Sequence, residues 1–314
     1  MKRLFNTTNL LILQVLISFI ALYFVNINND VAWHLHVAKS ILAGKTLYED
    51  VVEINLPFVY YFRTIAVSIA DAIGMTPMTA SKIVVACVGC LGILLLSKGL
   101  DKKDGLHQTL ILSFAFIALI LPLGMRINQF GQKEHLFIIA VVPYTIMRLL
   151  SKEGQASSRI YDFATFVAAI GFCIKPFYIL WLLALELMIL KSYYSKSYLS
   201  ILRRENIILG AVFMLYLLFM VLVTPNYFQE VIPLLSRFYY YYRMPADVFL
   251  FLKVLSHMAL YAIPLVMLFP FIPKPYKGLY WLLLTSILVA TIQLKGWQYH
   301  FFPAMSCAIL IYSI

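Results

Sequence analysis

The sequence predicts an all-α protein, a polytopic bundle of about ten transmembrane helices. Hydrophobic residues make up 62% of the 314 residues and charged residues only 12%, and the mean hydropathy is +0.87. Apolar runs of roughly 18 residues, the length needed to cross a bilayer, recur along the chain. Soluble globular domains are far less apolar. We therefore expect a single transmembrane domain over 1–314, without a separate soluble domain.

The first expected span, 10–25, indicates how the chain is oriented. It follows Met1-Lys2-Arg3, and positive charge before a span favours a cytoplasmic start. The apolar run is longer than the core of a signal peptide and lacks a small-x-small cleavage site after it, so we expect the span to be retained. Asp30 then emerges on the non-cytoplasmic side, which is the periplasm for a protein of the bacterial inner membrane.

The segment 28–76 is expected to form the first outer loop and to contain two juxtamembrane helices. Between 30 and 43, apolar residues recur at helical spacing, and Gly44 offers a stop. A second short helix at 57–73 carries Arg63 and an aspartate, which favours a position at the membrane surface over a full crossing.

Nine further apolar runs complete the expected bundle in chain order. They cover 79–97, 106–123, 136–150, 161–172, 177–190, 207–223, 248–271, 279–293 and 301–314. Fourteen of the 25 Lys and Arg residues then fall on the side assigned to the cytoplasm. This distribution agrees with the positive-inside rule.

The net charge of +11 is spread over loops, and no basic cluster is long enough to form a nucleic-acid groove. We therefore expect the basic residues to face lipid headgroups, with membrane lipids and not nucleic acid as partners. Cys87 and Cys90 have the CxxC spacing of metal and redox sites, but they lie in an apolar run. Packing of small residues between helices is the favoured interpretation there.

Four polar segments, far apart in the sequence, fall on the outer face of this topology. They are 30–53, 126–135, the turn Lys175-Pro176, and 295–300. Ionisable groups near lipid are costly and are rarely retained without a function. Their convergence on one side predicts a single outward-facing site at the membrane boundary.

Several interpretations of the first segment remain open. Asp30 has the position of either a general base or a helix cap, because Asp is also a preferred capping residue. Asp50 and Glu53 fit a site or a solvated loop. These carboxylates and His34 are potential ligands for a divalent cation, but no recognised ligand spacing is present, so we expect no required cofactor.

The other segments also have two interpretations each. Glu134 and His135 open an expected span, where an acidic residue complements the helix dipole. Arg126 and Lys133 flank the same turn, and a helix start with two cations is a competent phosphate site. A lysine at the end of a span, such as Lys175 or Lys295, snorkels to the headgroups by default.

Residues of the first loop also carry a family resemblance. They are Asp30, Trp33-His34-Leu35, Ala38-Lys39, Gly44, Leu47-Tyr48, Asp50, Glu53 and Pro57. This pattern resembles the first outer loop of GT-C-type integral-membrane glycosyltransferases, the superfamily of the protein O-mannosyltransferases and the lipid A aminoarabinose transferase. The later segments 131–135, 175–176 and 295–303 are similar to segments of bacterial transferases with this architecture.

The resemblance implies a GT-C bundle that takes a sugar from a polyprenyl-phosphate donor. The acceptor would be a glycan, lipid or protein on the non-cytoplasmic face, and Asp30 would be the base that deprotonates it. The residues expected to bind donor or acceptor are His34, Tyr48, Asp50, Glu53, Arg126, Lys133, Glu134, His135, Lys175, Lys295, Tyr299 and His300.

Two functions of other classes compete with glycosyl transfer. A transporter or flippase of lipid-linked intermediates would use the same charges along a pathway and should expose polar residues through whole spans. Most expected spans lack such residues at mid-length, with Glu186 as an exception. This favours the enzyme. A purely structural membrane subunit is the third option.

Overall fold

The computed structural model describes residues 6–100, 105–125, 128–150, 159–193, 203–238, 245–249 and 265–314, and within them it contains helices and no β-strand. The expected all-α class is confirmed for these residues. The α-helices are α1 (Thr7–Phe24), α2 (Asn29–Leu42), α3 (Phe58–Ile73), α4 (Pro77–Gly99), α5 (Gly105–Leu119), α6 (Leu121–Gly124), α7 (Lys133–Leu150), α8 (Arg159–Phe172), α9 (Ile179–Tyr193), α10 (Arg204–Val223), α11 (Ile232–Phe238), α12 (Ala246–Phe249), α14 (Gly278–Gln293) and α15 (Phe302–Tyr312). Short helical turns are Pro176–Tyr178, Tyr227–Val231, Lys274–Lys277 and Gln298–Phe301.

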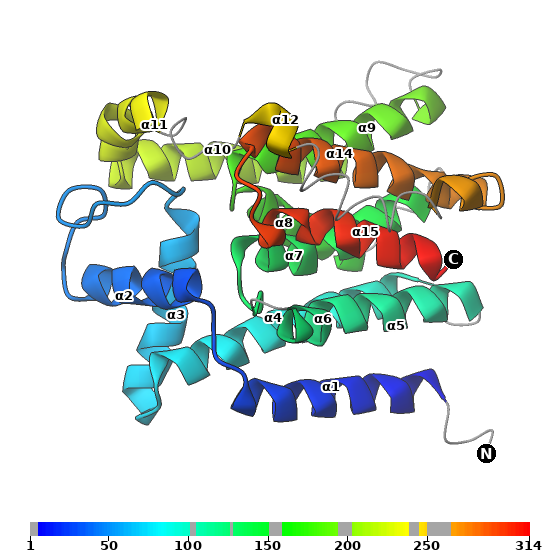
Figure 1. Ribbon diagram of the computed structural model, residues 1–314, viewed down its shortest axis with the longest axis horizontal. Coiled ribbons are helices and arrows are strands. Elements are labelled where there is room, and N and C mark those ends of the chain that lie inside the picture. The colour runs from blue at the N-terminus through cyan, green and yellow to red at the C-terminus, as the bar shows by residue number, and fades with distance from the viewer. Residues whose placement is uncertain are drawn as a thin grey trace.

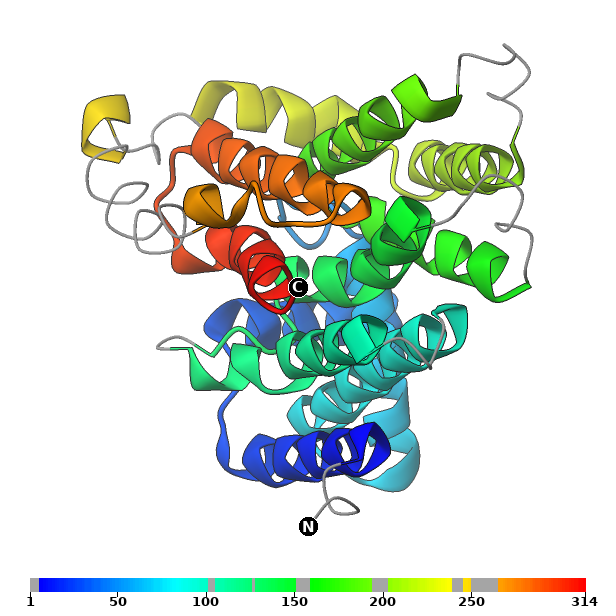
Figure 2. The ribbon, with the colours of Figure 1, turned by 90° about the vertical axis from the view of Figure 1, so that its right-hand side faces the viewer.

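The long helices run side by side, and α2, α3 and α11 gather at one end of the bundle (Figure 1). The first residues of α1 and the C-terminus lie at the other end. Figure 2 looks onto that second end and shows α1 at the outer edge of the stack. This position agrees with the small buried share of α1, 11% of its residues.

Four helical segments are long and apolar enough to cross a membrane: Thr7–Phe24, Pro77–Gly99, Arg204–Val223 and Lys274–Gln293. They coincide with the expected spans 10–25, 79–97, 207–223 and 279–293. Shorter apolar helices cover Gly105–Leu119 and Pro176–Ile189. These segments support a membrane protein by their length and composition. The expected span 248–271 lies mostly outside the described residues.

The two helices expected within 28–76 are present close to their expected bounds. The α2 helix begins after Asn28, whose side chain accepts a hydrogen bond from the backbone N–H of Asp30 at 2.9 Å. It ends just before Gly44, which has φ +87°. Glycine adopts this left-handed conformation without steric cost, so it stops the helix. The α3 helix ends in the same way at Gly74.

The expected span 106–123 is not one helix. It is divided into α5 and α6 around Ile120, because Pro122 has no N–H to continue the helical ladder. Two carbonyl oxygens near the break are satisfied by side chains: Ser18 donates to the oxygen of Leu119 at 3.2 Å, and a ring nitrogen of His135 bonds the oxygen of Ala118 at 2.8 Å. The break is therefore built into the packing of α1, α5 and α7.

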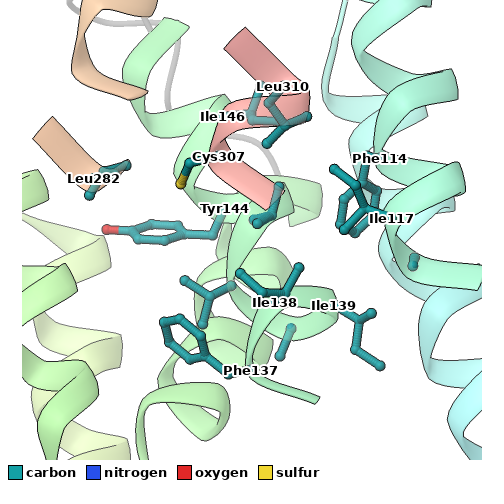
Figure 3. Close-up of a cluster of buried hydrophobic side chains, with 14 of the residues drawn as sticks. Phe114, Ile117, Phe137, Ile138, Ile139, Tyr144, Ile146, Leu282, Cys307 and Leu310 are labelled. Atoms are coloured by element: carbon teal, nitrogen blue, oxygen red, sulfur yellow. The ribbon is translucent and has the colours of Figure 1, made fainter. Parts of the chain in front are cut away.

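The central element of the fold is α7, in which every residue from Lys133 to Arg148 is buried. A helix that is apolar on all sides belongs in the core. Figure 3 shows side chains of α7, such as Phe137 and Tyr144, among neighbours from α5, α14 and α15. Because α7 passes through the core, its charged first residues are held firmly at the end of the bundle where α2 and α3 lie.

Close contact between α4 and α7 gives a first prediction. A Cβ added at Gly92 would lie 2.8 Å from the carbonyl oxygen of Ile139, so Gly92→Ala should force the two helices apart. We expect it to destabilise the protein by about 1–3 kcal/mol. The measurement is the melting temperature in detergent. Gly210→Ala in α10 is the control, because its Cβ meets nothing within 4 Å and alanine favours the helix. Equal melting temperatures for both variants would contradict close packing at Gly92.

Candidate functional site

A cavity of about 770 Å³ lies where α2 begins and α7 starts. It is lined by residues from each of the four polar segments that the sequence places on the outer face. Eight residues expected to act in catalysis or binding line it: Asp30, His34, Glu53, Lys133, Lys175, Lys295, Tyr299 and His300.

Asp30 lies in the first turn of α2 and is partly exposed to the cavity. It does not cap the helix, because the side chain of Asn28 has that role. One oxygen of the Asp30 carboxylate, Oδ2, accepts a hydrogen bond from Nε2 of the buried Gln132 at 3.2 Å. The capping interpretation is therefore wrong, and the carboxylate is oriented by a residue from the turn before α7.

Glu53 has a different environment and organises the loop wall. Its buried carboxylate accepts hydrogen bonds from Nε1 of Trp33 at 2.6 Å, from the backbone N–H of Ile54 at 2.7 Å and from Nδ2 of Asn55 at 3.2 Å. Lys133 donates to the other end of the Asn55 amide. With both oxygens engaged, Glu53 is suited to holding Trp33 and the 53–55 loop in place.

Three lysines bring positive charge to the cavity. Lys133 is buried, and this burial, helped by the nearby Lys175 ammonium, lowers its pKa to about 8. Lys175 forms an ion pair with Glu134, with Nζ 2.6 Å from Oε1. Lys295 is buried, with Nζ 4.9 Å from the centre of the Trp297 ring. Buried ammonium groups of this kind bind anionic oxygens strongly.

The two histidines of the cavity are neutral at neutral pH. Burial holds the pKa of His300 well below its usual range, and the ammonium groups of Lys175, Lys133 and Lys295 lower it further. Burial also lowers the pKa of His34, with smaller effects from the nearby cations. The cationic character of the cavity therefore comes from lysine and leaves these imidazoles as neutral hydrogen-bonding groups.

Other expected site residues lie away from the cavity wall. Asp50 is exposed in a tight turn, where its Oδ2 accepts from the backbone N–H of Thr46 at 2.7 Å. Tyr48 is buried behind the 53–55 loop, and its hydroxyl donates to the carbonyl oxygen of Asn55. Tyr48 therefore supports the 53–55 loop, and Asp50 stabilises its own turn.

His135 and Glu134 also lie behind the cavity. His135 is fully buried, and its Nδ1 accepts from the backbone N–H of Gly131 at 2.9 Å. Glu134 holds Lys175 and lies 3.9 Å from Nε2 of His300. Arg126, expected to bind phosphate, lies outside the described residues.

Sequence reasoning missed the part played by Arg63. Its charge indicates a surface position for the 57–73 helix, but its side chain is fully buried. Arg63 donates to the carbonyl oxygen of Gly131 and, at 2.9 Å, to Oγ of Ser81. Gly131 has φ +81° and forms the turn that presents Gln132 and Lys133. The only sign of this role in the sequence was a charged residue within an apolar pattern. Such a pattern does not show which residue the arginine contacts.

The described residues contain no group of three or more His, Cys, Asp or Glu side chains placed to hold a metal ion. No protein-family model, no curated protein and no solved structure matches this chain. Its function is therefore inferred from its own residues and their geometry.

Proposed function

We propose that the protein is an inverting glycosyltransferase of GT-C type. It would move a sugar from a polyprenyl-phosphate donor to a glycan, lipid or protein acceptor. The observation that carries this proposal is the combination, in one cavity, of a partly exposed carboxylate, Asp30, with lysines contributed by three other segments. In the proposed ten-span topology, this cavity faces the periplasm from the bacterial inner membrane.

The proposed reaction is a direct displacement at the anomeric carbon of the donor sugar. The acceptor hydroxyl gives its proton to Asp30 while its oxygen bonds to the anomeric carbon. The bond from that carbon to the phosphate oxygen breaks on the opposite side of the sugar, so the configuration inverts. The departing lipid phosphate takes the bonding electrons, and Lys133 and Lys295 stabilise its negative charge.

The proposed base, Asp30, and the proposed phosphate-binding cation, Lys133, are positioned by neighbouring residues of one turn. Gln132 orients the Asp30 carboxylate from one side, and Lys133, the next residue in the chain, lies on the cavity wall. Base and phosphate-binding cation therefore depend on the same turn before α7. A base and a cation held in fixed relation accelerate transfer through positioning and through stabilisation of the developing charge.

Reconstitution tests the proposal directly. Purified protein in liposomes is supplied with radiolabelled polyprenyl-phosphate sugars and with cell-envelope fractions as acceptors. We expect label to move from the lipid to an acceptor, and envelope glycans of cells without the gene to lack the matching sugar by mass analysis. Movement of the intact donor between leaflets without transfer would support the transporter alternative. No transfer with any donor by folded protein would contradict the enzyme.

A cluster of charged residues inside the bundle is relevant to the transporter alternative, because a transporter would have charges along its pathway. Arg148 of α7 lies 3.1 Å from Glu186 of α9 and 3.2 Å from Glu205 of α10. These charges pair with one another at the end of α7 away from the cavity. Such mutual pairing is typical of a cluster that joins helices, and the enzyme remains the function that we propose.

Lys133 provides a test of phosphate binding. Lys133→Ala is expected to raise the apparent KM for the donor by about tenfold or more, because a hydrogen bond to a charged group contributes roughly 1.5–3 kcal/mol. Lys39→Ala, on the exposed side of α2, is the control and should behave as wild type. An unchanged donor KM in the Lys133 variant would assign this residue to the loop structure alone.

The depressed pKa of Lys133 predicts a pH dependence. Because this ammonium loses its proton as pH rises through about 8, donor affinity in the wild type should fall above that pH. An ordinary lysine would keep its charge to about pH 10. The measurement is donor KM between about pH 6.5 and 9.5, and the Lys133→Ala variant should lack the transition near 8. The same transition in both proteins would contradict the assignment.

A further inference from the structure

We propose that Trp33 is a stacking subsite for a saccharide ring and that the acceptor of the reaction is a carbohydrate hydroxyl. The saccharide subsite stands on the geometry of the cavity. Its assignment to the acceptor rests on the proposed transferase function.

The position of Trp33 relative to Asp30 is the first observation. The two residues are three apart on α2, so they share one face of the helix, and both line the cavity. The Trp33 side chain is 47% exposed, although large aromatic groups are usually well covered. A molecule whose hydroxyl reaches the Asp30 carboxylate therefore has the Trp33 ring beside it.

The ring of Trp33 is held in a fixed orientation. Its indole N–H donates to the buried Glu53 at 2.6 Å, and one of its faces stacks on His36, with ring centres 5.3 Å apart and planes at 26°. A buried carboxylate is a strong acceptor for this N–H. Pre-oriented aromatic surface binds at a small entropic cost, since the ring does not need to be ordered when the ligand arrives.

A sugar ring fits the chemistry of this wall better than a lipid chain. The flat face of a pyranose presents a row of C–H groups, which are attracted to the electron-rich face of an indole. The cavity is also lined by Asn28, Asn29 and Gln298, and side-chain amides both donate to and accept from hydroxyl groups. An acyl or prenyl chain would offer these amides no hydrogen-bonding partner.

The wall of the cavity contains a second tryptophan. Trp297 also lines it, with the Lys295 ammonium 4.9 Å from its ring centre. We assign the donor to the neighbourhood of Trp297, because the Lys295 ammonium, one of the two cations proposed to stabilise the donor phosphate, lies beside its ring. Trp33 lies on the same helix as the base. The acceptor ring is therefore assigned to Trp33 and the donor sugar to the side of Trp297.

Trp281 is an exposed tryptophan outside the cavity and serves as a comparison for Trp33. It is 57% exposed on α14 and is not among the residues around the cavity. Exposed tryptophans of this kind are typical of the aromatic belt at a membrane surface. Trp281→Ala is therefore the matched control for Trp33→Ala.

The test is equilibrium binding of free saccharides, which does not require catalysis. The probes are disaccharides of glucose, mannose and N-acetylglucosamine, with sorbitol and a serine-rich peptide for comparison, and binding to detergent-solubilised protein is followed by saturation-transfer NMR. We expect at least one disaccharide to bind wild type and Asp30→Asn alike, and about tenfold more weakly to Trp33→Ala. Trp281→Ala should bind as wild type, and sorbitol and the peptide should not bind.

A folding defect in Trp33→Ala is controlled by Trp33→Phe, which retains a ring without the N–H. Both variants lose the hydrogen bond to the buried Glu53, so the melting temperature of the Phe variant should fall at most as far as that of the Ala variant, and its affinity should lie between those of wild type and the Ala variant. Binding that is equal in wild type and Trp33→Ala, binding of no disaccharide, or Trp33-dependent binding of the peptide would each overturn the subsite. Saccharide binding in a protein that transfers no sugar would instead remove the transferase function and leave the subsite.

Discussion

Replacing Asp30 by Asn is expected to reduce sugar transfer about a hundredfold or more, because the amide does not accept the acceptor's proton. The fold should be unaffected. Asn28, and not residue 30, caps α2, and the amide oxygen of the substituted side chain still accepts the hydrogen bond that Gln132 donates to the carboxylate. The variant therefore removes the ability of residue 30 to accept a proton while it keeps the shape of the side chain. The measurement is turnover with a polyprenyl-phosphate donor, together with the melting temperature.

The matched control is Asp50→Asn, in the turn that follows α2. Asp50 is exposed, and its carboxylate accepts from the backbone of Thr46 in a turn away from the cavity. Transfer by this variant should be close to wild type. If Asp30→Asn transfers at the wild-type rate, Asp30 is not the base, and Glu53 becomes the next carboxylate to test.

Replacing Arg63 by Ala is expected to give the largest loss of stability, about 3 kcal/mol or more. Arg63 is fully buried. Burial lowers its pKa to about 10, so it remains charged at neutral pH. Its removal leaves the carbonyl oxygen of Gly131 and the hydroxyl of Ser81 without their donors. The melting temperature should fall by roughly 5–10 °C.

Two variants show whether this loss comes from the hydrogen bonds. Ser81→Ala removes one of the two partners and should cost only about 1 kcal/mol. Arg63→Lys keeps a charge but lacks the fork that reaches both partners, so its stability should lie between Ala and wild type. An Arg63→Ala variant with the wild-type melting temperature would show that the Gly131 turn is held by other contacts.

Local signals made several helices of this fold predictable. The bounds of α2 follow from apolar spacing and from Gly44, which acts within a few residues of the helix end. The structure shows that Gly74 ends α3 in the same way. The break after α5 was missed, although Pro122 was visible, because the surrounding run is apolar throughout. The central position of α7 was also not predicted, because burial on all sides depends on helices that come later in the chain.

The site was predictable in its parts but not in its contacts. Topology alone placed the four polar segments on one face, and the structure brings residues of all four into one cavity. The hydrogen bonds from Gln132 to Asp30 and from Arg63 to Gly131 join residues 102 and 68 positions apart. Pairings over such distances leave no periodic pattern in a single sequence. The catalytic and binding roles stay predictions.

The central position of α7 has a consequence for the order in which the protein is made. Synthesis delivers α7 to the membrane before α8 and α15, which pack against it, and before α9, whose Trp181 donates to Thr145 of α7. Glu186, a partner of Arg148, follows 38 residues later, and Lys295 and His300 come from the last segment of this sequence. In a nascent chain, the charged first residues of α7 therefore exist before the residues 293–300 that complete the cavity wall. The cavity forms only after residue 300 has left the ribosome.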